Sequence, residues 1–158
     1  MPNFITRESY DLIMGKIKNI IEVEIPKVSK AKLLAAQEGD LSENAEYIGC
    51  KEKLELLSAQ CENLKKRISD PSFIESLRIP GNIVSVGTKV EIEDIDSDKK
   101  TVYTILGSED VDIEKNRISY VSPLAKGMIG KKAGDIVDIV VPDGKKKVKI
   151  LKVCHFMK

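Results

Sequence analysis

The sequence predicts an α+β protein with two domains, an antiparallel helical hairpin at residues 1–79 and a small sheet domain at residues 80–158. Two observations carry this prediction. Apolar residues recur at helical heptad spacing as far as about residue 69, with one short break at Gly39. Beyond Pro80 they alternate with a period of two, which favours antiparallel strands, and only one short segment there is typical of a helix.

The first arm of the predicted hairpin runs from about Arg7 to Glu38. Its seam positions follow alternating steps of four and three residues, with one polar exception at Glu24: Tyr10, Met14, Ile17, Ile21, Glu24, Val28, Ala31 and Ala35. Pro26 lies inside this arm. Because proline has no backbone N–H, we expect it to kink the helix or interrupt its hydrogen-bond ladder.

The second arm runs from Asn44 to Ser69, and its seam has no polar exception: Tyr47, Cys50, Leu54, Leu57, Cys61, Leu64 and Ile68. Only a few residues around Gly39 connect the arms, so the helices must be antiparallel neighbours in a coiled-coil hairpin. Each arm is about 40 Å long at the helical rise per residue. The Asp70-Pro71 pair ends the second helix, because a residue before proline disfavours helical geometry.

The second domain begins after the turn signal Pro80-Gly81-Asn82. Alternating apolar residues predict strands at residues 84–86, 90–92, 101–106, 136–141 and 147–153. Pro142-Asp143-Gly144 predicts a hairpin between the last two strands. Ser122 followed by Pro123 predicts the start of a short helix, and Gly130 predicts its end.

Composition excludes several classes of protein. The 26 basic and 25 acidic residues give a net charge of +1, so no global basic field is available for nonspecific binding to nucleic acid. No stretch approaches the roughly 18 apolar residues of a membrane span, and the N-terminus does not resemble a secretory signal. The three cysteines are far apart and are expected to be reduced thiols. We therefore expect a cytoplasmic protein without membrane contact.

Negative charge gathers where the two arms join. Four carboxylates lie between Leu33 and Cys50, and no lysine or arginine lies between those two residues: Glu38, Asp40, Glu43 and Glu46. Two carboxylates at the end of a rod can complete a metal site that another macromolecule supplies. Spacing alone also allows a structural interpretation, in which Asp40-x-x-Glu43 is a capping box at the start of the second helix. The two interpretations are compatible, because a cap also brings both side chains to the end of the rod.

Two motifs resemble those of one known family. The run Gly39-Asp40-Leu41-Ser42-Glu43-Asn44-Ala45-Glu46-Tyr47 is similar to the tip signature of the bacterial GreA/GreB transcript-cleavage factors. The run Ile118-Ser119-Tyr120-Val121-Ser122-Pro123-Leu124-Ala125-Lys126-Gly127-Met128-Ile129-Gly130-Lys131, followed by Gly134-Asp135, resembles their second signature. The similarity covers essentially the whole chain. It implies an FKBP-like fold for residues 80–158.

The resemblance also implies a function. Such a protein is not itself an enzyme. As a monomer it binds bacterial RNA polymerase, inserts its hairpin into the secondary channel and stimulates cleavage of the backtracked nascent RNA. The family's acidic pair falls on Asp40 and Glu43, which would be ligands of a Mg²⁺ ion shared with the polymerase and not bound stably by the free protein. Asn44 and Ser42 would support the pair by hydrogen bonds.

Contact residues follow from the same resemblance. Before the tip this chain has Ala35-Ala36-Gln37-Glu38 where the family usually has a basic residue, so Lys32 and Lys51 are expected to contact the RNA or the channel instead. The second motif suggests that Ser122, Pro123 and Lys126 lie near the polymerase contact.

Two other functions compete with this one. A channel-occupying inhibitor would share the architecture, but it would be expected to alter the acidic tip, and Asp40 and Glu43 are intact. A peptidyl-prolyl isomerase is suggested only by the implied FKBP-like fold, and fold does not fix function. Its pocket needs an aromatic lining, for which residues 80–158 offer only Tyr103, Tyr120 and Phe156.

Overall fold

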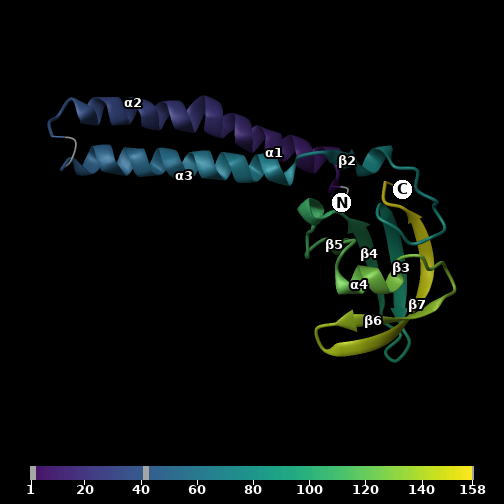
Figure 1. Ribbon diagram of the computed structural model, residues 1–158. Helices are drawn as coiled ribbons and strands as arrows, with labels where there is room; N and C mark the ends of the chain where they lie inside the picture. The colour runs from purple at the N-terminus through teal and green to yellow at the C-terminus, as the bar shows by residue number, and fades with distance from the viewer. Residues whose placement is uncertain (1–2, 41–42, 158) are drawn as a thin grey trace. The chain divides into compact units, whose positions relative to one another are not determined.

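The computed structural model describes residues 3–40 and 43–157, and contacts divide the chain into two units. One unit is the helical hairpin, Tyr10–Ser69, and the other combines Met1–Ser9 with Asp70–Lys158. The protein is therefore α+β, as predicted (Figure 1). The division differs from the predicted boundary at residues 79 and 80. The reason is a parallel pair of short strands, β1 (Asn3–Ile5) and β2 (Pro71–Phe73), which joins the two segments flanking the hairpin.

The first arm of the hairpin consists of three successive segments. They are the α-helix α1 (Arg7–Asn19), the π-helix η1 (Ile20–Glu24) and the α-helix α2 (Ile25–Ala36). The Ile25 N–H donates to the Ile20 carbonyl, five residues back, where an α-helix would bond four residues back. Pro26 follows directly. Because its ring would clash with the carbonyl of residue 22 in a regular helix, the wider turn relieves that clash, and the predicted interruption at Pro26 is confirmed.

The seam predicted for the first arm is partly wrong. Ile13, Ile17 and Ile20 are buried, whereas the predicted positions Met14 and Ile21 are 43% and 45% exposed. A π-turn adds one residue to the turn, so the buried face upstream of it moves by about one position. Downstream of η1 the buried positions again match the predicted seam, with Val28 half-buried and Ala35 buried, although Ala31 is exposed.

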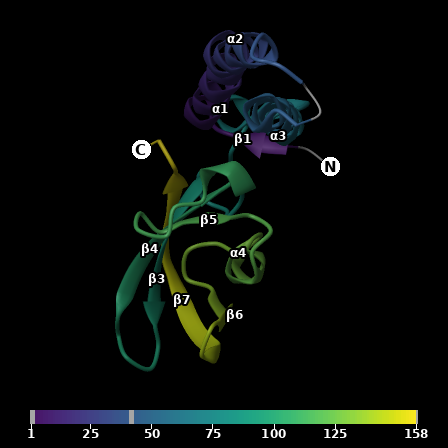
Figure 2. The same ribbon diagram turned by 90° about the vertical axis from the view of Figure 1, so that its left-hand side faces the viewer.

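The second arm agrees with its prediction. It is the α-helix α3 (Ala45–Arg67), which lies antiparallel beside the first arm (Figures 1 and 2). Every predicted seam residue is buried or half-buried, including Leu57, Cys61 and Ile68 with less than a tenth of their surface exposed. After the helix, Asp70 takes a positive φ of 46° and Pro71 begins β2, so the predicted end at the Asp70-Pro71 pair is confirmed.

The second unit is built on a five-stranded sheet in the order β5-β4-β3-β7-β6. All pairs are antiparallel except β4 with β5. The strands are β3 (Thr88–Asp94), β4 (Lys100–Leu106), β5 (Arg117–Ser119), β6 (Ile136–Val141) and β7 (Gly144–His155). The strand predicted at residues 84–86 is absent, because these residues lie in the irregular segment ahead of β3, although Val84 is buried in the core.

One short α-helix, α4 (Pro123–Met128), covers the sheet at β6 (Figure 2). The Ala125 N–H donates to the Ser122 hydroxyl at 3.2 Å, so Ser122 caps the helix as predicted. Ala125 and Met128 are fully buried and join the core with Val90, Ile105 and Ile150. Two 3₁₀ turns, η2 (Ile74–Ser76) and η3 (Ser108–Asp110), complete the unit.

A buried carboxylate fixes the start of α1. Asp110, from η3, is 6% exposed and accepts hydrogen bonds from the Thr6 N–H, the Thr6 hydroxyl and the Ser9 hydroxyl. The Arg7 N–H donates to both oxygens of Glu75. Two carboxylates therefore satisfy N–H groups that the first turn of a helix leaves without internal partners.

Within residues 3–40 and 43–157, no helix is both long and apolar enough to cross a lipid bilayer. Cys50, Cys61 and Cys154 are free thiols, as expected.

Candidate functional site

The end of the hairpin carries a shallow hollow of about 410 Å³. It is lined by the residues that join the two arms, namely Glu38, Gly39, Asp40, Glu43, Asn44, Ala45 and Glu46. All four carboxylates of the sequence cluster are in this set. The negative charge predicted for the tip therefore converges on one surface.

The chain reverses direction at Gly39. The last turn of α2 closes when the Glu38 N–H donates to the Ala35 carbonyl at 3.1 Å. Gly39 then takes a φ of 142°, a backbone conformation that a side chain disfavours. The turn continues as the Glu43 N–H donates to the Asp40 carbonyl at 3.4 Å. Leu41 and Ser42 lie outside the described residues, so the support predicted for Ser42 has no structural description.

Asn44 connects the two arms. Its side-chain oxygen accepts a hydrogen bond from the Tyr47 N–H at 3.1 Å and so caps α3. Its side-chain amide donates to the Ala35 carbonyl at 2.6 Å, in the last turn of α2. The capping interpretation of Asp40 and Glu43 is therefore wrong, because Asn44 occupies the cap position of α3.

Both predicted metal ligands are exposed. Asp40 and Glu43 lie on the solvent-facing side of the joining segment, and neither is buried against the hairpin. Mg²⁺ prefers oxygen ligands and commonly takes one or two carboxylates together with substrate phosphate and water. Within the described ranges, no group of three or more histidine, cysteine, aspartate or glutamate side chains is arranged to hold a metal ion. The donor set at the tip thus fits part of a magnesium site.

Lys32 and Lys51 flank the tip on opposite arms. The Lys32 ammonium lies 5.5 Å from the centroid of the Tyr47 ring, an attractive cation–π distance, and both side chains are half-buried. Lys51 is exposed on α3. Sequence reasoning assigned Tyr47 to packing and missed its contact with Lys32. Heptad positions within one helix carry no signal for such a pair across two helices.

The residues predicted to dock on a partner surround the start of α4. Ser122 is occupied locally, since its hydroxyl donates to the Ser119 carbonyl at 2.7 Å and accepts from Ala125. Pro123 and Lys126 are exposed on the first turns of the helix. They belong to the sheet unit, whereas the carboxylates belong to the hairpin unit.

Comparison with known proteins identifies the family. The description "Transcription elongation factor, N-terminal" matches residues 3–71, and "Transcription elongation factor, GreA/GreB, C-term" matches residues 79–155. The transcription elongation factor GreA of Helicobacter hepaticus is 37% identical over 150 residues, which cover 95% of this chain and 92% of that protein. GreA of Orientia tsutsugamushi is 37% identical over 149 residues, 94% of each chain.

Among solved structures, the crystal structure of the GreA factor homolog 1 (Gfh1) protein of Thermus thermophilus covers 94% of this chain and 96% of its own, with 18% identity and a TM-score of 0.43. The family matches account for both units, and the curated relatives span nearly the whole chain. The chain therefore belongs to the GreA/GreB family of transcription elongation factors.

Proposed function

We propose that this protein binds bacterial RNA polymerase, inserts its hairpin into the secondary channel and stimulates cleavage of backtracked nascent RNA. One observation carries the proposal: Asp40 and Glu43 are exposed at the end of a long hairpin, in a segment without any cation. The helix α3 alone, with 23 residues, is about 35 Å long. A hairpin of this length can carry the carboxylates deep into a channel. The protein acts in the cytoplasm, as a monomer, and meets the RNA 3′ end there.

The reaction belongs to the polymerase. A Mg²⁺ ion, when bound, supplies a Lewis acid that activates water and stabilises the leaving oxygen. Asp40 and Glu43 would hold that ion through their carboxylate oxygens, and the other ligands would come from the polymerase and the RNA phosphate. The two side chains also accept hydrogen bonds, so either can orient the attacking water. This division of ligands makes the protein a cofactor of cleavage, not an enzyme.

Asn44 and Gly39 hold the carboxylates in place. The Asn44 side chain ties the joining segment to both arms, and Gly39 permits the reversal that brings the acidic residues to the end. Preorganised ligands lose little conformational freedom on binding, which favours a higher affinity of the pair for a weakly held ion. Lys32 and Lys51 would then lie behind the tip, where they face RNA or the channel wall.

The alternative of a peptidyl-prolyl isomerase finds little support in the sheet unit. The hollow beside Tyr103 holds only about 150 Å³, below the usual size of ligand pockets. A Lys146–Asp94 ion pair of 3.6 Å lies within it. A hydrogen bond from the Asp96 backbone N–H, with Lys146 close by, keeps the pKa of Asp94 below its usual value. A charged hollow suits an apolar proline ring poorly.

A cleavage assay tests the proposal. The protein is added to a stalled, backtracked elongation complex with Mg²⁺, and release of short 3′ RNA fragments is followed over time. We expect the wild type to stimulate release and Glu43→Gln to lower the rate by about a hundredfold, because a metal ligand is worth several kcal/mol in such a site. Glu46→Gln removes an equal charge from the same hollow and serves as the control.

Two results would refute the proposal. Retained stimulation by Glu43→Gln would remove the metal-ligand role. A wild-type protein that binds the complex, releases no fragments and slows elongation would instead be a channel-occupying inhibitor.

A further inference from the structure

Two contacts join the arms directly behind the acidic tip. The Lys32 ammonium of α2 lies 5.5 Å from the centroid of the Tyr47 ring of α3. One turn nearer the tip, the Asn44 side-chain amide donates to the Ala35 carbonyl at 2.6 Å. Along α3 the Tyr47 N–H donates to the Asn44 side-chain oxygen at 3.1 Å, which connects the two contacts. We call Lys32, Ala35, Asn44 and Tyr47 the tip clamp.

The spacing of these residues builds the tip clamp. Lys32 and Ala35 are three positions apart on α2, and Asn44 and Tyr47 are three positions apart at the start of α3. Side chains at this spacing lie on one face of a helix, so both contacts form on the facing sides of the arms. Lys32, Asn44 and Tyr47 are half-buried, and Ala35 is 3% exposed. The tip clamp is therefore part of the packed interface between the arms, although Lys32 carries a charge.

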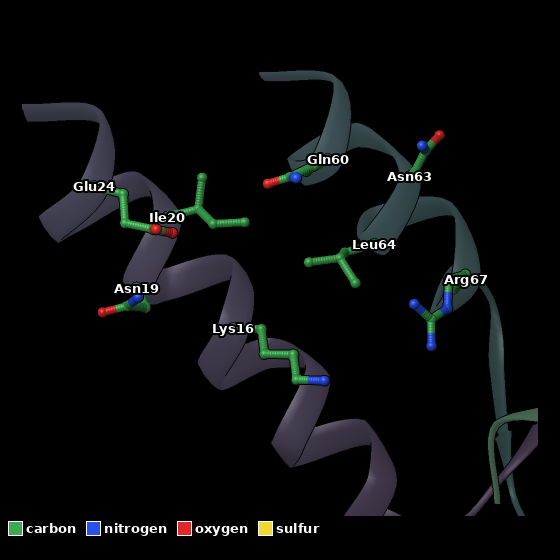
Figure 3. Close-up of a pocket in the computed structure, with 8 residues that line it drawn as sticks. All are labelled: Lys16, Asn19, Ile20, Glu24, Gln60, Asn63, Leu64 and Arg67. Atoms are coloured by element: carbon green, nitrogen blue, oxygen red, sulfur yellow. The ribbon is translucent and has the colours of Figure 1, made fainter. Parts of the chain in front are cut away.

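Apolar packing between the arms is thin next to the tip clamp. A hollow of about 590 Å³ begins one residue away on each arm, at Ala31 and Glu46. Ala31 and Gly49 line it from opposite arms, and their small side chains fill little of the space. Farther along the hairpin lies a hollow of about 440 Å³, where Ile20 and Leu64 point toward each other across the gap (Figure 3). The arms thus depend on the tip clamp for their connection at the acidic end.

The tip clamp is continuous with the acidic pair. Asn44 belongs to the tip clamp and also lines the hollow that holds Asp40 and Glu43. Glu43 directly precedes Asn44, and the hydrogen bond from the Tyr47 N–H holds Asn44. A shift of the Tyr47 ring therefore reaches Glu43 through one residue. Ligands in a functional site must be held within about 0.5 Å of their productive geometry, so a small shift is sufficient to weaken a metal site.

We propose that Lys32 is a positioning residue for RNA cleavage, which acts through the Tyr47 ring and not through contact with RNA. This inference rests on the proposed function, because it takes Asp40 and Glu43 as the ligands that must be placed. The Lys32 ammonium attracts the face of the Tyr47 ring and so holds the start of α3 in the arrangement that presents the carboxylates. A neutral side chain of the same length lacks this attraction.

Three roles of the Lys32 charge predict different results for its removal. A positioning role predicts that Lys32→Met raises the Mg²⁺ concentration needed for cleavage, because the carboxylates are held less well. A purely electrostatic role predicts the opposite, because removing a cation near carboxylates strengthens their attraction for Mg²⁺. A contact with RNA predicts weaker binding to the elongation complex and an unchanged Mg²⁺ requirement at saturating protein. The sign of the change in Mg²⁺ requirement thus separates the three roles.

The main test is a double-mutant cycle on RNA cleavage in a backtracked elongation complex at saturating protein. Lys32→Met keeps the length of the side chain and removes its charge, and Tyr47→Leu removes the ring. The Mg²⁺ concentration for half-maximal cleavage is measured for the wild type, both single variants and the double variant. We expect Lys32→Met to raise it about threefold in the wild-type background and to have no effect beside Tyr47→Leu.

Control variants separate this role from a general loss of structure. Lys30→Met removes an exposed lysine from the same helix and should leave the Mg²⁺ requirement unchanged. Lys32→Arg keeps a cation that can lie over the ring, so it should retain the wild-type requirement. A purely structural loss lowers the fraction of folded protein, for which saturation compensates. Circular dichroism at the assay temperature shows whether each variant is folded, and Tyr47→Met replaces Tyr47→Leu if the latter is not.

A measurement on the free protein tests the tip clamp without the polymerase. Hydrogen exchange of the Tyr47 N–H, followed by NMR, reports on its bond to Asn44. We expect exchange to be about threefold faster in Lys32→Met than in Lys30→Met. Faster exchange together with a wild type that stimulates no cleavage would refute the proposed function and, with it, the role of Lys32 in cleavage. Equal exchange in the two variants would refute the tip clamp alone.

Two results of the cleavage assay would also overturn the inference. An equal effect of Lys32→Met with and without the Tyr47 ring would show that the charge acts independently of the ring. An unchanged or lower Mg²⁺ requirement would exclude positioning, and weaker binding to the elongation complex would then identify RNA contact as the role of Lys32.

Discussion

The two arms of the hairpin carry the same kind of heptad spacing, yet only α3 keeps that spacing in three dimensions. In α3 every predicted seam residue packs inward, from Tyr47 to Ile68. In the first arm the π-helix η1 shifts the buried face upstream, so Ile13 and Ile20 replace Met14 and Ile21. A heptad pattern therefore predicts the buried face only while the helix keeps its regular period.

The sequence hides this shift because apolar residues occur in adjacent pairs. Ile13 is followed by Met14, and Ile20 is followed by Ile21. Either member of each pair satisfies a heptad pattern, so periodicity cannot choose between them. Pro26 determines which member of each pair is buried, because the wider turn that it favours rotates the upstream helix.

Removing one residue from each arm gives the largest expected contrast. Deletion of Glu55 rotates half of α3 and turns its seam away from the first arm. We expect this deletion to cost several kcal/mol, a large part of the roughly 5–15 kcal/mol that stabilises a typical domain. Deletion of Glu22 together with Pro26→Ala converts the π-turn to an α-turn and keeps the buried face. We expect the free energy of unfolding of this variant to lie within about 2 kcal/mol of the wild-type value.

Urea unfolding monitored by circular dichroism at 222 nm measures both deletions. Both glutamates are exposed, so the loss of their own contacts is matched. Equal destabilisation by the two deletions would contradict a special role for the π-turn.

Adjacent isoleucines sharpen the comparison within the first arm. Ile20 is 5% exposed and Ile21 is 45% exposed. Ile20→Ala should cost about 2–5 kcal/mol, as expected when a buried side chain leaves a cavity. Ile21→Ala should cost less than about 1 kcal/mol, because much of the side chain already faces water. The same unfolding experiment measures both variants. A larger loss of stability for Ile21→Ala than for Ile20→Ala would show that the first arm keeps the uninterrupted heptad seam.

Substitutions of Asn44, which connects the two arms, should lower the stability of the hairpin by less. Asn44→Ala removes both the cap on α3 and the hydrogen bond to Ala35, and should cost about 1–2 kcal/mol. Asn44→Ser keeps a neutral acceptor for the Tyr47 N–H but loses the amide donor to Ala35, so it should cost about half as much. Equal losses for the two variants would place the whole effect in the cross-arm bond.

Local patterns predicted much of the fold. The helix α3, the strand β6 and the capped start of α4 follow from spacing and from Ser122 with Pro123. The pairing of β1 with β2 was not predicted, because each strand has three residues and they are far apart in the sequence. The bonds between Thr6 and Asp110 span 104 positions and have no local signal either.

The candidate site was predicted in a similar way. The acidic cluster and its place at the end of the hairpin follow from the charge pattern and the short connection. The identity of the cap did not follow, because Asp40 and Asn44 are both good capping residues and only the backbone decides between them.

We propose above all that the tip carboxylates raise the occupancy of a weakly held magnesium ion. The most direct measurement is the Mg²⁺ concentration for half-maximal RNA cleavage, compared between wild-type protein and Glu43→Gln at saturating protein. We predict that the variant needs about tenfold more Mg²⁺ and that excess Mg²⁺ restores part of its rate, since a lost carboxylate ligand weakens the site. An unchanged Mg²⁺ requirement, at any rate of cleavage, would contradict the claim.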